Sequence, residues 1–143
     1  MKITEMTEKH AAELANLDKI CFSVPWSENS FREEAENPLA KYFVAEEDGK
    51  LIGYLGVWCV QDEGQITNIA VLPEYRRKGI ASKLLEHLVC ECKGFSQLVL
   101  EVRESNSGAL ALYEKYGFKR VGMRKNFYHS PTENAIIMIR GDE

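Results

Sequence analysis

The order of predicted helices and strands indicates an α/β protein with one mixed sheet. Two amphipathic helices are followed by three strands in an antiparallel meander, and strand–helix–strand units fill the second half. A meander gives antiparallel neighbours, whereas a strand–helix–strand crossover gives parallel ones. The chain has 143 residues, of which 45% are hydrophobic. This length and composition predict a single domain over residues 1–143, with helices covering the sheet.

The first half of the chain is predicted to hold a strand-like start, two helices and three strands. After residues 2–4, Thr7 can cap a helix over residues 8–21, whose apolar side chains recur at helical spacing. Ser27 can cap a second helix, which ends at residue 36 before Asn37-Pro38. The three strands are expected over residues 42–46, 51–60 and 65–71, with turns at Asp48-Gly49 and Asp62-Glu63-Gly64.

The second half alternates between helices and strands. A helix is expected from Gly79 to about Lys93, and the run Leu98-Val99-Leu100 predicts a strand over residues 97–102 that is buried on both faces. Ser105 or Asn106 then caps a helix that ends at Tyr116, with Gly117 just beyond it. Strands over 118–123 and 135–139 follow, and the loop between them holds residues 129–134.

Composition excludes several classes of protein. The net charge is −4, which argues against broad nucleic-acid binding. No apolar run reaches the roughly 18 residues that a membrane span needs, and the first residues lack the apolar stretch of a signal peptide. We therefore expect a cytoplasmic protein. The pair Cys90 and Cys92 has neither zinc-ligand nor redox spacing, so the cysteines are expected to be reduced thiols and no metal site is predicted.

The most informative stretch is a basic turn between a strand and a helix, with the sequence IAVLPEYRRKGIASK over residues 69–83. A helix start carries unpaired backbone N–H groups and a partial positive charge. Gly79 has no side chain, so an anion can approach those groups closely, and Arg76, Arg77 and Lys78 lie beside it. The turn is either a phosphate or pyrophosphate pocket or a basic turn ahead of an ordinary helix. It matches neither of the common nucleotide-binding loops.

The pattern Arg76-x-x-Gly79-x-Ala81 after an Ile-Ala-Val strand resembles the acetyl-CoA loop of the GNAT N-acetyltransferases. The resemblance implies a mostly antiparallel sheet with one splayed parallel pair, and acetyl-CoA as co-substrate. It also implies that the turn holds the CoA pyrophosphate and that the preceding strand pairs with the pantetheine arm. The implied cofactor-binding residues are Ile69, Ala70, Val71, Arg76, Arg77, Lys78, Gly79, Ile80, Ala81, Ser82 and Asn106.

Two residues of the second half are candidates for acid–base chemistry. Glu101 lies near the C-terminal end of an apolar strand, where sites form in open α/β sheets. A carboxylate among apolar neighbours suits a general base, but a rim glutamate paired with Lys or Arg explains the residue as well. Tyr113 lies on the apolar stripe of its helix, so it is either a core aromatic or a hydroxyl donor. Asn106 is explained by helix capping alone.

Four separated motifs sharpen the resemblance to one branch, the ribosomal-protein-alanine N-acetyltransferases (RimI). They are Phe22-x-x-Pro25-Trp26-Ser27, the run from Leu100 to Asn106, Ala111-Leu112-Tyr113-Glu114-x-Tyr116-Gly117-Phe118, and Arg124-x-Asn126-Phe127-Tyr128. The run Asn134-Ala135-Ile136-Ile137-Met138 fits as well. By this resemblance Glu101 is the general base, Tyr113 the general acid, and Pro25, Trp26 and Tyr128 line the peptide groove. Trp26 can equally be a core anchor and Tyr128 a surface aromatic.

The resemblance implies transfer of an acetyl group to the N-terminal amine of a protein, possibly a ribosomal protein with alanine first. Two other functions stay open. An enzyme of the same family can acetylate a small amine or a lysine side chain, and a CoA-binding module can lack turnover altogether. The presence of both Glu101 and Tyr113 counts against the last of these.

Overall fold

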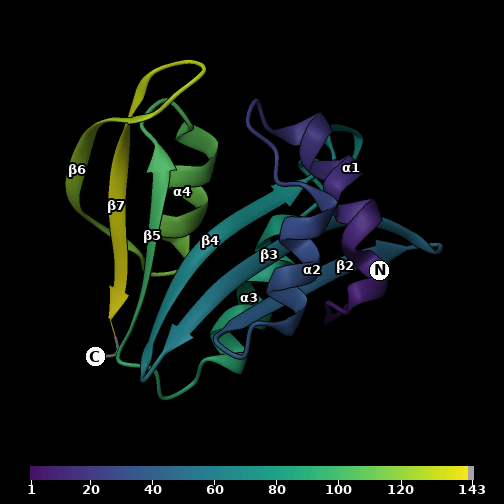
Figure 1. Ribbon diagram of the computed structural model, residues 1–143. Helices are drawn as coiled ribbons and strands as arrows, with labels where there is room; N and C mark the ends of the chain where they lie inside the picture. Colours follow the sequence, from purple (N-terminus) through teal and green to yellow (C-terminus); the bar gives the residue numbers. More distant parts are fainter. Residues whose placement is uncertain (142–143) are drawn as a thin grey trace.

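The computed structural model describes residues 1–141, which form a seven-stranded sheet between two layers of helices (Figure 1). The strand order is β1-β2-β3-β4-β5-β7-β6. Neighbouring strands are antiparallel except β4 and β5, which are parallel. The mixed α/β sheet predicted from the sequence is therefore confirmed. The strands are β1 (Lys2–Glu5), β2 (Ala40–Glu47), β3 (Lys50–Val60), β4 (Glu63–Val71), β5 (Gln97–Arg103), β6 (Lys119–Tyr128) and β7 (Glu133–Gly141).

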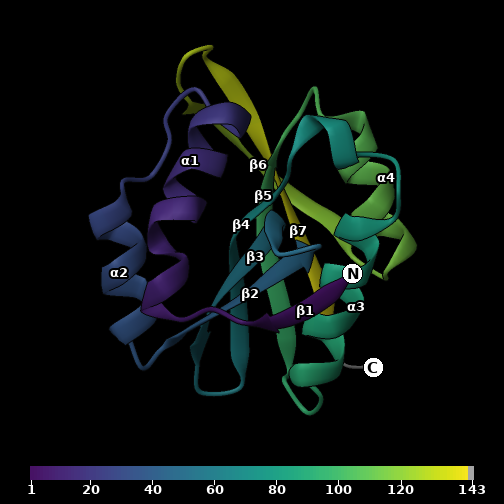
Figure 2. The same cartoon turned by 90° about the vertical axis from the view of Figure 1, so that its right-hand side faces the viewer.

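The helices divide between the two faces of the sheet (Figure 2). On one face lie α1 (Ala11–Cys21), which a short 3-10 turn (Glu8–His10) precedes, and α2 (Glu28–Glu36). On the other face lie α3 (Ile80–Glu91) and α4 (Ser107–Lys115), and a second 3-10 turn (Pro73–Tyr75) follows β4. Two of the three predicted caps form, because Ser27 Oγ accepts from Ser30 N at 3.1 Å and Asn106 Oδ1 accepts from Ala109 N at 3.2 Å. Thr7 precedes the first 3-10 turn, but its side chain makes no capping hydrogen bond.

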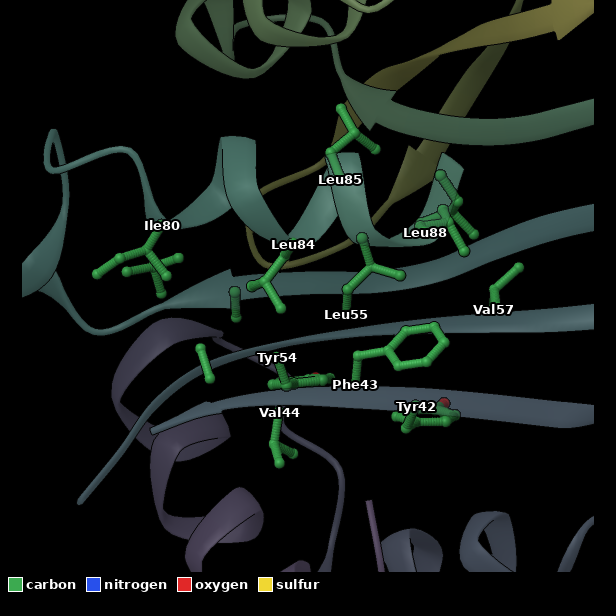
Figure 3. Packing of buried hydrophobic residues seen from close by; sticks show 14 of the residues in the cluster. Tyr42, Phe43, Val44, Tyr54, Leu55, Val57, Ile80, Leu84, Leu85 and Leu88 are labelled. Carbon is green, nitrogen blue, oxygen red and sulfur yellow. The ribbon is translucent and has the colours of Figure 1, made fainter. Parts of the chain in front are cut away.

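The core lies on both faces of strands β2 to β4 (Figure 3). On the α3 side, Leu84 and Leu88 point towards Phe43, Leu55 and Val57. On the opposite side, the rings of Tyr42 and Tyr54 stack 6.1 Å apart, and Phe31 of α2 meets both edge-on. A fully buried large apolar side chain contributes roughly 1.5–3 kcal/mol, so this core fixes β3 and β4 firmly against the helices.

Two predictions about the strands around β4 are wrong. The turn expected at Asp62-Glu63-Gly64 lies earlier, because Gln61 has a positive φ of 56° and β4 begins at Glu63. Gly64 instead leaves room for the Leu98 side chain, since a Cβ there would lie 2.6 Å from Leu98 Cδ2. Strand β5 is buried on one face only: Leu98 and Leu100 are buried, whereas Val99 is half-buried.

The last hairpin is longer than predicted. Strand β6 runs from Lys119 to Tyr128, so residues 124–128, which the sequence suggested were part of the loop, belong to the strand. Strand β7 extends to Gly141 rather than ending at residue 139. Pairing with β7 supplies the backbone hydrogen bonds that make this polar segment a strand, although nearly every β6 side chain is exposed.

Strands β4 and β5 pair over their first residues and then separate. Their parallel register ends at Gln65 opposite Val99, whereas β4 continues to Val71 and β5 to Arg103. Figure 1 shows the two strands diverging above this point. In addition, β4 carries a bulge at Thr67, because Gly56 of β3 pairs with Asn68 and Val57 pairs with Ile66. The sheet is thus splayed at its centre, and Ile69–Val71 and Glu101 lie beyond the point where the two strands stop pairing.

Candidate active site

The turn before α3 has the shape of an anion site. Arg77 and Gly79 both have positive φ values, 63° and 80°, and Gly79 is the N-cap of α3 with no side chain to satisfy the first turn. No atom lies within 4 Å of the position that a Cβ on Gly79 would occupy. No side chain therefore covers the start of α3 at Gly79, where the N–H groups of the first turn and the helix dipole favour negative charge.

The cations of this turn have different partners. Arg76 turns back and donates from Nε to the carbonyl oxygen of Val71 at 3.0 Å, so it ties the turn to the end of β4. The Lys78 ammonium lies 5.4 Å from the ring centroid of Tyr75. The side chains of Arg76, Arg77 and Lys78 are all exposed at the mouth of the turn. Arg76 thus shapes the loop, while Arg77 and Lys78 are available to a ligand.

Glu101 lies on the face of the sheet that carries α1 and α2. Side chains alternate along β5, and Leu98 points to the α3 side, where it meets Gly64 and Val57, so Glu101 points the opposite way. Its Oε2 lies 3.0 Å from Nε of Arg124, which is 59% exposed, while the Glu101 side chain is 18% exposed. The pair has no hydrogen-bond alignment, and Oε2 is buried without a hydrogen-bond partner among residues 1–141. The rim ion pair weighed from the sequence exists, but it leaves the carboxylate with spare acceptor capacity.

Tyr113 lies on α4, on the opposite face, and is 4% exposed. Its ring meets Phe118 edge-on at 5.8 Å. Burial raises its pKa, and a nearby Tyr128 raises it further, so the hydroxyl stays protonated at ordinary pH. Within residues 1–141 that hydroxyl makes no hydrogen bond that would hold it elsewhere. Tyr113 is therefore both a core aromatic and an uncommitted donor.

Tyr128 lies beside Glu101 at the end of β6. Burial raises its pKa to about 12, and the negative charge of Glu101 contributes to the rise. The guanidinium of Arg103 stacks 4.5 Å from the Tyr128 ring centroid and donates to the carbonyl oxygens of His129 at 3.1 Å and Pro131 at 2.9 Å. The sequence analysis does not single out Arg103. Its position two residues after Glu101 in β5, which puts both side chains on one face of the sheet, is the signal that could have done so.

The Pro25-Trp26 loop lies on the same face as Glu101. Trp26 is half-buried, with its ring 5.6 Å from that of Phe31 and 6.4 Å from that of Tyr42, so the core-anchor alternative is met. Pro25 is exposed. The backbone N–H of Trp26 donates to Oδ2 of Asp18 at 2.9 Å, and Asp18 is 1% exposed. Asp18 was also missed, although a carboxylate on the apolar stripe of a helix was visible in the sequence.

Tyr128 lies near Glu101 and also near Tyr113, at the splayed end of β5. Ile69 to Val71 form the other side of the opening, and Asn106 caps α4. Two surface hollows, beside Asp48 and beneath Phe95, are lined by other residues. Among residues 1–141, no cluster of His, Cys, Asp or Glu could hold a metal ion, and no helix has the length and hydrophobicity to cross a membrane. The candidate site is thus the place where β4 and β5 diverge, with the basic turn before α3 on one face of the sheet and the Glu101 carboxylate on the other.

Comparison with known proteins shows which class of enzyme has this arrangement. The sequence matches the acetyltransferase (GNAT) family over residues 11–118. The chain therefore belongs to the GNAT family and is an acetyltransferase. Enzymes of this family use acetyl-CoA. One structural neighbour, the PaiA N-acetyltransferase of Thermoplasma acidophilum, was solved in complex with coenzyme A. It matches with a TM-score of 0.81 at 19% identity, over 99% of this chain and 100% of that one. The resemblance stated from the acetyl-CoA loop is confirmed.

Within this family the chain is similar to the ribosomal-protein-alanine N-acetyltransferases. It is 40% identical to the Escherichia coli [ribosomal protein bS18]-alanine N-acetyltransferase over 129 residues, which is 86% of this chain and 85% of that protein. A Bacillus subtilis protein to which the same activity is provisionally assigned is 48% identical over 120 residues, covering 82% of this chain and 80% of that one. The crystal structure of the E. coli ribosomal-protein-S18-alanine enzyme matches with a TM-score of 0.91 at 34% identity, over 98% of this chain and 92% of that one.

Proposed function

We propose that this acetyltransferase acetylates the N-terminal amine of a ribosomal protein whose first residue is alanine. The single observation that carries the proposal is the splayed β4–β5 opening, with an anion site on the α3 side and Glu101 on the α1 side. Such an opening lets acetyl-CoA enter from one face and an amine from the other. The similarity to enzymes that act on bS18 supports the choice of substrate.

Acetyl-CoA binding is assigned to β4 and the turn before α3. The N–H groups from Gly79 to Ser82 receive the pyrophosphate, and Arg77 and Lys78 add positive charge beside it. The unpaired edge of β4 at Ile69–Val71 hydrogen-bonds the pantetheine arm, as an added strand would. Asn106, at the start of α4, contributes a further CoA contact beyond its capping role.

The chemistry is direct transfer from the thioester to the amine. Glu101, through a water molecule, removes a proton from the α-ammonium group, whose pKa of about 8 requires only a modest base. The free amine attacks the thioester carbonyl, and a backbone N–H of Ile69–Val71 stabilises the negative charge that develops on its oxygen. The carbon–sulfur bond then breaks, and Tyr113 donates a proton to the departing thiolate. A second proton leaves the nitrogen to complete the amide.

Most of the rate enhancement is assigned to positioning. Holding the amine next to the thioester can supply on the order of 7–11 kcal/mol, whereas one acid–base group adds about 10²–10⁴-fold. Pro25, Trp26 and Tyr128 line the path of the peptide on the face that holds Glu101. We also assign the enzyme to the cytoplasm, with a protein substrate and no direct binding of nucleic acid or membrane.

A peptide acetylation assay with mass spectrometry tests the substrate class. Peptides that begin with a free alanine should be acetylated at the N-terminus, whereas the same peptides with a blocked N-terminus and an internal lysine should react poorly. The ε-amine, with a pKa of about 10.4, is also harder to deprotonate. Acetyl groups found mainly on internal lysines, or on small amines only, would remove the N-terminal assignment.

A further inference from the structure

Two side-chain oxygens at the splayed opening are buried without a partner. They are Oδ1 of Asn68 on β4 and Oε2 of Glu101 on β5, and within residues 1–141 they are the only buried side-chain nitrogen or oxygen atoms with no hydrogen-bond partner. A buried acceptor with no donor destabilises a protein, so such a group calls for a ligand or a functional explanation. Glu101 has one in its assigned role as base, whereas Asn68 has none so far.

The register places Asn68 and Glu101 at the same level across the opening. The last parallel pair is Gln65 opposite Val99, and Glu101 lies two residues further along β5. Asn68 lies three residues beyond Gln65 along β4, but Thr67 is the extra residue of a bulge. Asn68 therefore lies two pleat positions beyond Gln65, as Glu101 lies two positions beyond Val99. The bulge therefore sets the level of Asn68 as well as its face.

Asn68 also shares a face of the sheet with Glu101. Residues paired across antiparallel strands point to the same side, and Asn68 pairs with Gly56, beside which the Tyr42 ring lies on the α2 face. The face occupied by α1 and α2 is also the face of Glu101. If Thr67 instead paired with Gly56, with no bulge, residue 68 would pair with Leu55 and its side chain would point towards α3.

A hydrogen-bond network around Asp18 lies beside the Asn68 amide. The Tyr54 hydroxyl donates to Oδ1 of Asp18 at 2.6 Å, and the backbone N–H of Trp26 donates to the other oxygen of the same carboxylate. The Asn68 side chain lies beside that hydroxyl, and among residues 1–141 its Oδ1 is the amide atom that is buried without a hydrogen-bond partner. The amide oxygen is left for something else.

We propose that Oδ1 of Asn68 accepts the N–H that the substrate amine keeps throughout the reaction, which makes Asn68 a specificity-determining residue for primary amines. This inference rests on the proposed function. A primary ammonium group has three N–H bonds. One proton leaves to Glu101 before attack and a second leaves when the amide forms, so one N–H persists from substrate to product. A secondary amine, as in N-methylalanine, ends the reaction with none.

The test compares two peptides that differ by one methyl group, one beginning with alanine and the other with N-methylalanine. For Asn68→Leu, which keeps the size and removes the acceptor, kcat/KM for the alanine peptide should fall at least tenfold, while that for the N-methyl peptide should change little. Asn68→Asp keeps an acceptor oxygen and should retain the preference of the wild-type enzyme for the primary amine. Thr67→Val is the control, because it removes a polar group of the same strand that already has Tyr42 as partner at 3.3 Å.

Each outcome decides between explanations. A fall of equal size for both peptides in Asn68→Leu, or no fall for the alanine peptide, overturns the role of Asn68 and leaves the proposed function intact. If the wild-type enzyme acetylates neither peptide, the proposed function fails, and this inference fails with it. The Kd for acetyl-CoA and the Tm identify a folding defect. If Asn68→Leu folds poorly, Asn68→Ala gives the same comparison without the larger side chain.

Discussion

Oε2 of Glu101 and Nε of Arg124 lie 3.0 Å apart without the alignment of a hydrogen bond. Because Arg124 is 59% exposed, this is an ion pair at the edge of the site, and exposed pairs contribute only about 0–1 kcal/mol. The pair neither satisfies the carboxylate nor explains why one of its oxygens is buried. Two substitutions separate the ion pair from the assigned chemistry.

Glu101→Gln should slow the enzyme far more than Arg124→Gln does. Loss of the general base lowers kcat by about 10²–10⁴-fold, whereas loss of the exposed cation should change it less than about fivefold. Steady-state kinetics with acetyl-CoA and an alanine peptide measure both. Similar small losses in the two variants would mean that Glu101 serves only as the partner of Arg124.

Tyr113→Phe should lower kcat by roughly tenfold or more, because the ring is kept and only the hydroxyl assigned to the thiolate is lost. The Tm should change little, since that hydroxyl has no hydrogen bond to lose within residues 1–141. Tyr116→Phe, at the C-cap of the same helix, is the matched control, because it removes a hydroxyl that donates to Glu86 at 2.8 Å. A fully active Tyr113→Phe enzyme would refute the general-acid assignment.

Local signals in the sequence were enough for the elements that have caps and turns. Ser27 and Asn106 cap their helices, and Asp48-Gly49 forms the expected hairpin turn, with positive φ values of 51° and 78°. These structures depend on residues close in sequence, so the pattern of side chains predicts them. The acetyl-CoA loop was recognisable for the same reason, since its residues from Arg76 to Ala81 are contiguous.

Features that depend on distant pairing could not be predicted in this way. The bulge at Thr67 arises from a mismatch between β3 and β4, and nothing local marks it. Residues 124–128 lack an alternating pattern and become strand because β7 pairs with them. Asn68 was not singled out, because its level and face depend on that bulge. The apolar run Leu98-Val99-Leu100 predicts burial of Val99, but Val99 is only half-buried. A run of apolar residues does not show which face of a strand the helices cover.

The folded protein should lose stability at alkaline pH through its buried tyrosines, most of all Tyr54. Burial and the adjacent Asp18 raise the pKa of Tyr54 above its ordinary value of about 10. Between these two pKa values the unfolded chain has released a proton that the folded protein retains. The contribution of each such tyrosine to stability is therefore constant below about pH 10 and falls by up to about 1.4 kcal/mol per pH unit above it.

Tyr54→Phe isolates this contribution. At pH 8 the variant should be less stable than the wild type, by about 1.5–3 kcal/mol, because the hydrogen bond to the Asp18 carboxylate is lost. As the pH rises above about 10, the difference should shrink, because phenylalanine has no proton to retain. Urea unfolding at several pH values from 8 to 11 measures the difference. Parallel curves over this range would contradict the assigned pKa shift.

Gly79→Asp should weaken binding of acetyl-CoA at least tenfold, or about 1.4 kcal/mol, because it puts a negative charge where the pyrophosphate is assigned. Gly49→Asp is the matched control, since Gly49 and Gly79 have similar positive φ values, 78° and 80°, and open space around the Cβ position. Both variants share the backbone strain, so a difference between them reports the site. Gly79→Asn, with no charge, should lie between the wild type and Gly79→Asp. Isothermal titration calorimetry gives each Kd, and equal affinities in Gly79→Asp and Gly49→Asp would place the pyrophosphate elsewhere.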